Sequence, residues 1–201
     1  MSVFVLMDGK NYVILPEAKD YKRIGEGDTG PNTGGMGAIS PVPFATASLM
    51  KKIEEKAIKP TVEGLIKEGL EYRGFIFFGF MITDNEPYMI EYNCRMGDPE
   101  TEVVIPRLKN DLVELLSAAA NGKLDQIKIE TDERTTATVV AVSGGYPGDY
   151  KKDISIKGMD SINPADSILF HMGKTEKNGE VLTNGGRVFC ITSYGKSVFD
   201  A

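Results

Sequence analysis

The 201-residue sequence has little of several features that would indicate other classes of protein. It has two cysteines, Cys94 and Cys190, whose wide separation gives neither the spacing of a zinc site nor a disulfide framework. The net charge of -6 shows no basic excess, which argues against nucleic acid as a partner but leaves small phosphorylated substrates open. No apolar run approaches a membrane span, and the N-terminus lacks the basic flank and apolar stretch of a signal peptide. We therefore expect a cytoplasmic protein that binds neither membrane nor nucleic acid.

The bulk composition is that of an ordinary globular protein. Hydrophobic residues make up 41% of the chain and charged residues 26%, and the length allows one or two domains. The sequence contains no internal repeat and no low-complexity segment. Its character changes near Gln126, from mixed helix and strand patterns to short strands and turns. We therefore predict two domains, residues 1–125 and residues 126–201, the second rich in β-structure.

Local patterns predict most of the regular elements. Residues 2–7 and 10–15 flank Asp8-Gly9, which is a strong hairpin signal. One helix is predicted from Thr46 to about Glu68 with an interruption at Pro60, and a second opens at Asp111 and ends at Gly122. In the second domain the patterns predict strands at 135–143, 154–157 and 168–172, and a hairpin at 180–192. His171 lies within one of these strands and has no acid or nucleophile beside it in sequence, so a structural role is favoured.

Charged side chains crowd the end of an apolar hairpin, at residues 91–101. Because alternate side chains of a strand point to opposite faces, Glu91 and Asn93 are predicted to share one face, and Ile90 and Tyr92 the other. A carboxylate and an amide oxygen suit a hard divalent cation such as Mg²⁺. The alternative is that the strand ends in polar residues because the chain leaves the core there, and the pattern alone leaves both interpretations open. Further charges follow on a turn with Gly97 and Pro99, namely Arg95, Asp98 and Glu100.

A second unusual stretch is rich in glycine, Asp28-Thr29-Gly30-Pro31-Asn32-Thr33-Gly34-Gly35-Met36-Gly37. Glycines let a backbone approach a ligand closely, and successive free N–H groups can hold an anion. The stretch is not a phosphate-binding P-loop, because no lysine follows the last glycine, and it lacks the strand-to-helix context of a dinucleotide fingerprint. Composition alone favours a plain surface loop.

Four motifs in order resemble the phosphoribosylamine–glycine ligase family of the ATP-grasp superfamily, also called glycinamide ribonucleotide synthetases. The motifs are residues 28–38, residues 91–101, Gly144-Gly145-Tyr146-Pro147-Gly148-Asp149-Tyr150, and Thr183-Asn184-Gly185-Gly186-Arg187-Val188. The resemblance covers essentially the whole chain but only the later part of that enzyme. It implies an α+β fold, in which the C-terminal part of an ATP-grasp domain, a mostly antiparallel sheet with helices, precedes a small β-rich domain.

The resemblance also implies an activity, the joining of glycine to 5-phosphoribosylamine with ATP through a glycyl phosphate, in de novo purine biosynthesis. By motif, Glu91 and Asn93 match the ligands of Mg²⁺ or Mn²⁺, and Lys22 and Arg23 match a basic pair near the ATP phosphates. The pocket for the two small substrates is matched by Asp28, Thr29, Asn32, Gly34 and Gly35. Arg95, Asp98 and Glu100 match groups that act on or orient the substrates. Residues 75–82 offer no further carboxylate, so two protein ligands to the metal are expected.

The same resemblance makes the chain a fragment, since the N-terminal substrate domain and most ATP contacts of the family lie outside it. We expect the chain to be inactive alone and to self-associate through surfaces that the missing parts would cover. Two alternatives stay open. One is another ATP-grasp carboxylate ligase, such as a biotin carboxylase, and the other is a non-catalytic module that binds phosphorylated ligands or a protein partner.

Overall fold

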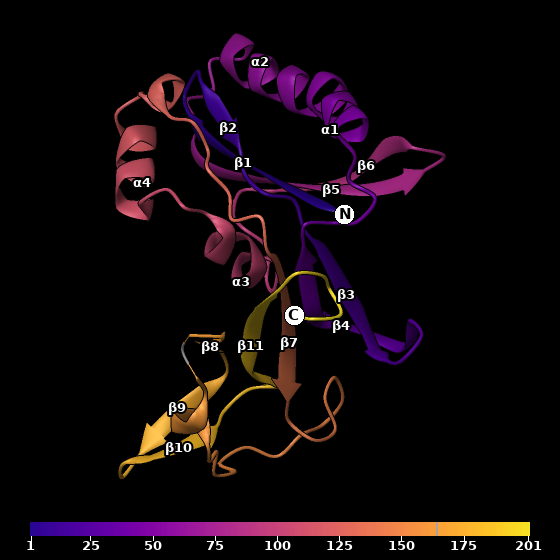
Figure 1. The fold of residues 1–201 in the computed structure, drawn as a ribbon, viewed down its shortest axis with the longest axis vertical. Coiled ribbons are helices and arrows are strands. Elements are labelled where there is room, and N and C mark those ends of the chain that lie inside the picture. The colour runs from indigo at the N-terminus through magenta and orange to yellow at the C-terminus, as the bar shows by residue number, and fades with distance from the viewer. Residues whose placement is uncertain (164) are drawn as a thin grey trace. The chain divides into compact units, whose positions relative to one another are not determined.

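The computed structural model describes residues 1–163 and 165–201, and these form two compact units, each built from separate stretches of the chain (Figure 1). The first unit consists of Met1–Lys19, Ser40–Gly97 and Val104–Glu133. The second unit consists of Asp20–Ile39, Asp98–Val103 and Arg134–Ala201. Helices and mostly antiparallel strands make up the units, which confirms the predicted α+β class. The predicted division after residue 125 stays a prediction.

The first unit is organised around a four-stranded antiparallel sheet in the order β2-β1-β5-β6. The strands are β1 (Ser2–Asp8), β2 (Tyr12–Ile14), β5 (Arg73–Thr83) and β6 (Glu86–Asn93). The predicted hairpin at Asp8-Gly9 is confirmed, with Met7 opposite Tyr12. The β5–β6 connection is a two-residue turn, Asp84-Asn85, in which both residues have positive φ, as the right-handed twist of a hairpin favours.

Helices lie on both faces of this sheet (Figure 1). One face is covered by α1 (Ala47–Ile53), the π-helical turn η1 (Glu54–Ile58) and α2 (Lys59–Lys67), and Val3, Val5 and Met7 of β1 belong to that core. Alternation then points Phe4 and Leu6 to the other face, and α4 (Leu112–Ala120) contacts β1 and β5. Every residue of β1 is consequently buried.

The predicted helix boundaries are confirmed by their caps. Thr46 is the N-cap of α1 and its hydroxyl accepts a hydrogen bond from the amide of Leu49 at 3.2 Å. Asp111 is the N-cap of α4 (Leu112–Ala120), and its carboxylate accepts a hydrogen bond from the amide of Glu114 at 3.0 Å. Pro60 follows directly on the π turn in a continuous helical stretch, and this turn takes up the interruption that the missing N–H of Pro60 causes.

The second unit contains a five-stranded sheet in the order β3-β4-β7-β11-β8 and a separate β9–β10 hairpin. The strands of the sheet are β3 (Lys19–Gly25), β4 (Thr29–Ser40), β7 (Thr135–Val142), β8 (Ser167–His171) and β11 (Arg187–Gly195), and the hairpin consists of β9 (Lys174–Lys177) and β10 (Glu180–Thr183). Short helical turns complete the described chain, α3 (Thr101–Val104), η2 (Ile105–Arg107), η3 (Leu124–Gln126) and η4 (Met159–Ser161). Within the described ranges no helix is long and apolar enough to cross a membrane.

Three sequence predictions for this unit are wrong. The glycine-rich stretch is not a loop, because most of it forms β4 and pairs within the sheet. The expected hairpin at 180–192 does not form, since β10 pairs with β9 while β11 pairs with β7 and β8. The turn that closes β9–β10 is Asn178-Gly179, where both residues have positive φ, so the stronger local turn signal prevails. The strand expected at 154–157 is reduced to one isolated bridge, between Ser155 and Leu182.

Candidate active site

The glycines of β4 are required by close approaches within the second unit. A Cβ on Gly37 would lie 2.5 Å from the carbonyl oxygen of Thr138 on β7. A Cβ on Gly35 would lie 2.4 Å from Cδ of Pro99, and Gly35 also has a φ of +120°, which L side chains rarely adopt. The glycine-rich motif therefore brings the backbone of β4 against the turn that carries Asp98.

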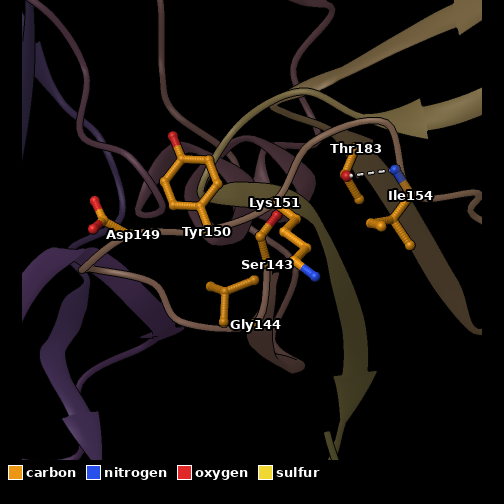
Figure 2. Close-up of a pocket in the computed structure, with 8 residues that line it drawn as sticks. Ser143, Gly144, Asp149, Tyr150, Lys151, Ile154 and Thr183 are labelled. Atoms are coloured by element: carbon orange, nitrogen blue, oxygen red, sulfur yellow. Dashed lines mark hydrogen bonds between the residues drawn. The ribbon is translucent and has the colours of Figure 1, made fainter.

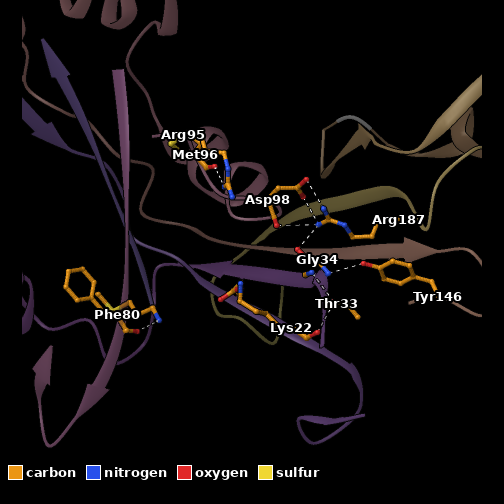
Figure 3. A network of polar contacts seen from close by, with 12 residues as sticks. Lys22, Thr33, Gly34, Phe80, Arg95, Met96, Asp98, Tyr146 and Arg187 are labelled. Carbon is orange, nitrogen blue, oxygen red and sulfur yellow. Dashed lines mark hydrogen bonds and ion pairs between the residues drawn. The ribbon is translucent and has the colours of Figure 1, made fainter. Parts of the chain in front are cut away.

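Arg187, at the start of β11, joins that turn to β4 (Figure 3). Its Nη1 donates to Oδ1 of Asp98 at 2.8 Å, and its Nη2 donates to Oδ2 at 3.0 Å. Nη1 also donates to the carbonyl oxygen of Gly34 at 3.0 Å. This paired arrangement uses the rigid guanidinium fork, which fixes the orientation of a carboxylate more tightly than a lysine would.

Tyr146 completes the arrangement from the loop after β7. Its hydroxyl accepts a hydrogen bond from the amide of Gly34 at 2.9 Å. Its ring occupies the space beside Gly186, where an added Cβ would lie 2.2 Å from Cδ2 of the ring. Four stretches far apart in sequence, around residues 34, 98, 146 and 187, are thus held together (Figure 3).

A cavity of about 460 Å³ opens beside this network, entirely within the second unit. It is lined by Asp98, Glu102, Tyr146, His171, Met172, Gly173, Gly186 and Arg187. Such a concave site with a few convergent charged groups is typical of a small-molecule pocket. His171, assigned a structural role from sequence, lies at this cavity, and its role stays a prediction.

Glu102 is the most perturbed acid of the cavity. Its Oε2 is buried and has no hydrogen-bond partner among the residues that the structure describes. Burial raises the pKa of Glu102 to about 7, the negative charges of Asp98 and Glu100 act in the same direction, and the charge of Arg187 opposes them. This carboxyl group therefore exchanges its proton near neutral pH.

A larger cavity of about 620 Å³ lies elsewhere in the second unit (Figure 2). Its lining consists of Val142, Ser143, Gly144, Asp149, Tyr150, Lys151, Ile154 and Thr183. The hydrogen bond drawn there runs from the amide of Ile154 to the Thr183 hydroxyl at 3.1 Å and serves the local backbone. Size alone does not identify a site, so we place the candidate active site at the smaller cavity, where charged groups converge.

The predicted metal pair lies on β6 of the first unit. A β-bulge between Gly79 and Phe80 in the ladder places Phe78 opposite Tyr92 and Phe80 opposite Met89. Met89 packs into the core under the helices, and Tyr92 packs edge-on against Phe78 with ring centroids 5.3 Å apart. The bulge shifts the alternation by one residue. Tyr92 therefore points toward the helices, and its two neighbours point to the opposite face.

Glu91 and Asn93 consequently share a face, as predicted. Within residues 1–163 and 165–201, no three His, Cys, Asp or Glu side chains lie close enough together to hold a metal ion. The carboxylate of Glu91 is exposed and no described residue pairs with it. Two oxygen ligands suit Mg²⁺ or Mn²⁺, whose remaining positions are usually filled by water and substrate phosphate. The donor set is therefore chemically fit for such a cation.

The remaining predicted site residues are placed as follows. Gly34, Gly35 and Asp98 lie together at the network described above. Arg95 is exposed and donates to the neighbouring carbonyl oxygen of Met96 at 2.8 Å (Figure 3). Glu100, only 3% exposed, is part of the interior.

The other five predicted residues belong to the β3–β4 hairpin, and Lys22, Arg23 and Thr29 make contacts within it. Arg23 donates to the carbonyl oxygen of Gly30 at 2.6 Å, and Lys22 pairs with Asp20 at 2.9 Å. The Thr29 hydroxyl donates to the carbonyl oxygen of Glu26 at 2.7 Å. Asp28 and Asn32 are exposed on the same hairpin. Of the residues predicted for the substrate pocket, Asp28, Thr29 and Asn32 therefore lie on the β3–β4 hairpin. Gly34 and Gly35 lie at the network around Arg187.

Four residues of the cavity were not given a functional role from sequence, Glu102, Tyr146, His171 and Arg187. Tyr146 and Arg187 each follow a pair of glycines, which is the one local signal that marks them. Glu102 looks like an ordinary first-turn helical glutamate, and its burial arises only when β7 and β11 pack against that turn.

Comparison with known proteins gives a consistent result. The family model described as phosphoribosylglycinamide synthetase, ATP-grasp (A) domain, matches residues 1–101, and the one described as the C domain of the same synthetase matches residues 136–201. A phosphoribosylamine–glycine ligase of Vibrio cholerae is 46% identical over 201 residues, covering 100% of this chain and 47% of that protein. One from Caldanaerobacter subterraneus is 42% identical over 200 residues and is covered to 48%.

Solved structures agree with these matches. The structure of phosphoribosylamine–glycine ligase from Thermotoga maritima superposes with a TM-score of 0.88 at 38% identity, covering 100% of this chain and 49% of that one. The biotin carboxylase domain of a thermophilic 2-oxoglutarate carboxylase gives a TM-score of 0.64 at 16% identity, which shows a shared fold alone. The chain spans about half the length of the curated relatives it matches. On the strength of the two family models and these identities, the chain belongs to the phosphoribosylglycinamide synthetase family.

Proposed function

We propose that this chain supplies the metal-binding hairpin and the acceptor pocket of an ATP-dependent ligase that joins glycine to 5-phosphoribosylamine. The observation that carries the proposal is the network in which Arg187 holds Asp98 and Gly34 beside a charged cavity. It stands in a chain whose relatives at 42% to 46% identity are named phosphoribosylamine–glycine ligase. The products are glycinamide ribonucleotide, ADP and phosphate, and the step belongs to purine biosynthesis in the cytoplasm.

The reaction explains why such a site combines a metal ion with charged side chains. A carboxylate acylates an amine poorly, so the γ-phosphate of ATP first converts glycine into glycyl phosphate. Phosphoryl transfer is promoted mainly by positioning and by neutralising the charge of the transferred group. Glu91 and Asn93 would hold the Mg²⁺ or Mn²⁺ that supplies this neutralisation.

The other predicted residues receive roles in the same scheme. Lys22 and Arg23 bind phosphate, and Arg95, whose guanidinium is exposed, binds a substrate carboxylate or phosphate. Asp98, oriented by Arg187, faces the substrates from the cavity wall, while buried Glu100 supports the turn. The pocket for glycine and phosphoribosylamine is formed by Gly34 and Gly35, and by the hairpin residues Asp28, Thr29 and Asn32.

The proposal covers a ligase longer than this chain. Because the chain spans about half of its relatives, we propose that the other half supplies the remaining ATP and substrate contacts. The chain alone also has an exposed sheet edge at β6, where Tyr88 and Ile90 are 59% and 62% exposed, and Met81 of the adjacent β5 is 58% exposed. Unpaired strand edges with apolar side chains favour association, so we propose that the isolated chain self-associates.

The test uses a polypeptide in which this chain is continuous with the segment that corresponds to the rest of its relatives. Mass spectrometry should detect glycinamide ribonucleotide only when glycine, phosphoribosylamine and Mg-ATP are all present. Glu91→Gln should lower kcat by orders of magnitude because it removes one ligand charge, whereas the exposed helical Glu63→Gln should leave kcat unchanged. An unaltered kcat for Glu91→Gln at saturating Mg²⁺ would refute the metal assignment, and absence of the product would refute the ligase.

A further inference from the structure

The carboxyl group of Glu102 is an ionisable group of the cavity to which the proposed scheme gives no task. Its backbone is fixed by the second-unit sheet, since the Thr192 hydroxyl of β11 donates to the carbonyl oxygen of Glu102 at 2.9 Å. The Thr136 hydroxyl of β7 donates to the next carbonyl oxygen, that of Val103, at 2.8 Å. The side chain then lines the cavity with Asp98 and Arg187.

The neighbouring charges do not neutralise Glu102. Both terminal nitrogens of Arg187 are already committed to Asp98, and one of them also to Gly34. Oε2 of Glu102 is buried with no partner in the described residues. Buried polar atoms almost always have a partner, and an unpartnered one is costly unless a ligand or a reaction uses it. Glu102 therefore carries a desolvated carboxyl group at the edge of the cavity.

The other acidic groups that face Glu102 do not fit the same task. Asp98 has both carboxylate oxygens engaged by Arg187, and Glu100 is 3% exposed. The Cys190 thiol beneath is buried, and burial raises its pKa to about 11. His171 lines the cavity from β8 and is exposed. Among these groups Glu102 combines a free acceptor oxygen with a place on the cavity wall. The pKa of about 7 that burial gives it lets it take up and release a proton near neutral pH.

We propose that Glu102 accepts the proton that the amine of phosphoribosylamine loses as it attacks glycyl phosphate; this inference rests on the proposed function. In that step the new C–N bond forms, the bond between the carbonyl carbon and the phosphate oxygen breaks, and phosphate leaves with the electron pair. The proton passes from the substituted nitrogen to the carboxylate of Glu102 and then to water. The formation of glycyl phosphate from ATP and glycine needs no such acceptor. Only the second half-reaction, the attack by the amine, should therefore depend on Glu102.

The test compares Glu102→Gln with the starting ligase in the longer polypeptide. The substitution keeps the size of the side chain but removes the proton acceptor, so kcat for glycinamide ribonucleotide should fall by about 10²–10⁴-fold, the usual worth of a general base. Trapping of glycyl phosphate by hydroxylamine, measured without phosphoribosylamine, should be unchanged. The acidic limb of the kcat–pH profile, with an apparent pKa near 7, should disappear in Glu102→Gln and persist in the exposed control Glu176→Gln.

The outcomes separate the inference from the function on which it rests. Loss of hydroxamate and product together in Glu102→Gln would indicate a structural role and overturn the inference, as would an unchanged pH profile. Partial activity of Glu102→Asp with a retained acidic limb would support it. If the starting ligase forms no glycyl hydroxamate, the proposed function itself fails. Carbon-13 NMR titration of the 201-residue chain gives a readout besides activity, and an ordinary Glu102 pKa near 4.3 would overturn the inference.

Discussion

The carboxyl group of Glu102 should make the stability of the chain depend on pH. Its folded-state pKa of about 7 exceeds the value of about 4.3 expected in the unfolded chain. The folded state therefore binds more protons between these two values, so the stabilisation is complete below the lower pKa and is lost as pH rises through the higher one. Glu102→Gln cannot ionise and should lose this dependence.

Urea unfolding of the chain at pH 5 and pH 8 tests this prediction. Relative to the unaltered chain, Glu102→Gln should gain stability at pH 8 and show a smaller difference between the two pH values. Glu176→Gln, an exposed carboxylate on β9, should keep the original pH difference. An equal pH difference in the chain and in Glu102→Gln would show that burial does not perturb this group.

Gly35 should be intolerant of any side chain. Gly35→Ala places a Cβ 2.4 Å from Pro99 at a φ of +120°, so the turn with Asp98 has to move away from Arg187. In the longer polypeptide we expect the KM for glycine or phosphoribosylamine to rise far more than the KM for ATP. Gly64→Ala is the matched control, since its Cβ meets nothing within 4 Å and alanine favours a helix interior by roughly 0.5–1 kcal/mol. A defect confined to ATP in Gly35→Ala would assign this strand to the nucleotide instead.

At the scale of elements, Asp8 connects the first hairpin to the segment after α4. Its Oδ1 accepts hydrogen bonds from the amides of Lys10 and Asn11, and its Oδ2 accepts one from the amide of Leu124 at 2.9 Å. Burial alone would raise the pKa of Asp8, but the hydrogen bonds from Asn11, Leu124 and Lys10 outweigh it and lower that pKa. The stabilisation is therefore present above the ordinary pKa of an aspartate and is lost as pH falls through the folded-state value.

Asp8→Ala should consequently destabilise the first unit. It leaves the buried amide of Leu124 without an acceptor, which costs about 1–3 kcal/mol. Urea unfolding at pH 7 measures the loss, and Asp125→Ala, an exposed neighbour of Leu124, should change the free energy of unfolding little. Equal stabilities of the two variants would show that the Asp8 hydrogen bonds contribute nothing net.

The elements that were predictable from sequence are those fixed by local signals. Thr46 and Asp111 cap their helices through hydrogen bonds to residues three positions away, and Asp8-Gly9 closes a hairpin between adjacent strands. The elements that were missed depend on distant partners. Glycines give β4 the character of a loop in sequence, and only the close approach of β7 at Thr138 shows why the strand needs them.

The site residues divide in the same way, into those that local signals predict and those that depend on distant partners. Glu91 and Asn93 fall on one strand, so strand periodicity was enough to put them on a shared face, although the bulge that directs this face was not visible in the sequence. Arg187 lies 89 residues from Asp98 and 153 residues from Gly34 along the chain. No periodic pattern in a sequence predicts contacts between residues so far apart in it. The perturbed state of Glu102 arises from the same long-range packing.

For the molecule as a whole, we expect this chain to contribute one part of a longer active site. Alignment of bound reactants can be worth about 7–11 kcal/mol of the barrier to a reaction. A polypeptide that holds one set of contacts cannot supply most of that alignment. We therefore expect the 201-residue chain to fold, to self-associate in sedimentation velocity, and to show no turnover. A monomer at high concentration would contradict the self-association.

The most direct test of the ligase assignment is the rate of ADP release with glycine, phosphoribosylamine and Mg-ATP, measured for the chain alone and for the longer polypeptide. We expect no release above background for the chain alone. For the longer polypeptide we expect release that requires both glycine and phosphoribosylamine and that is lost in Glu91→Gln. Release by the chain alone at the rate of the longer polypeptide, or release by the longer polypeptide that does not depend on glycine, would contradict these expectations.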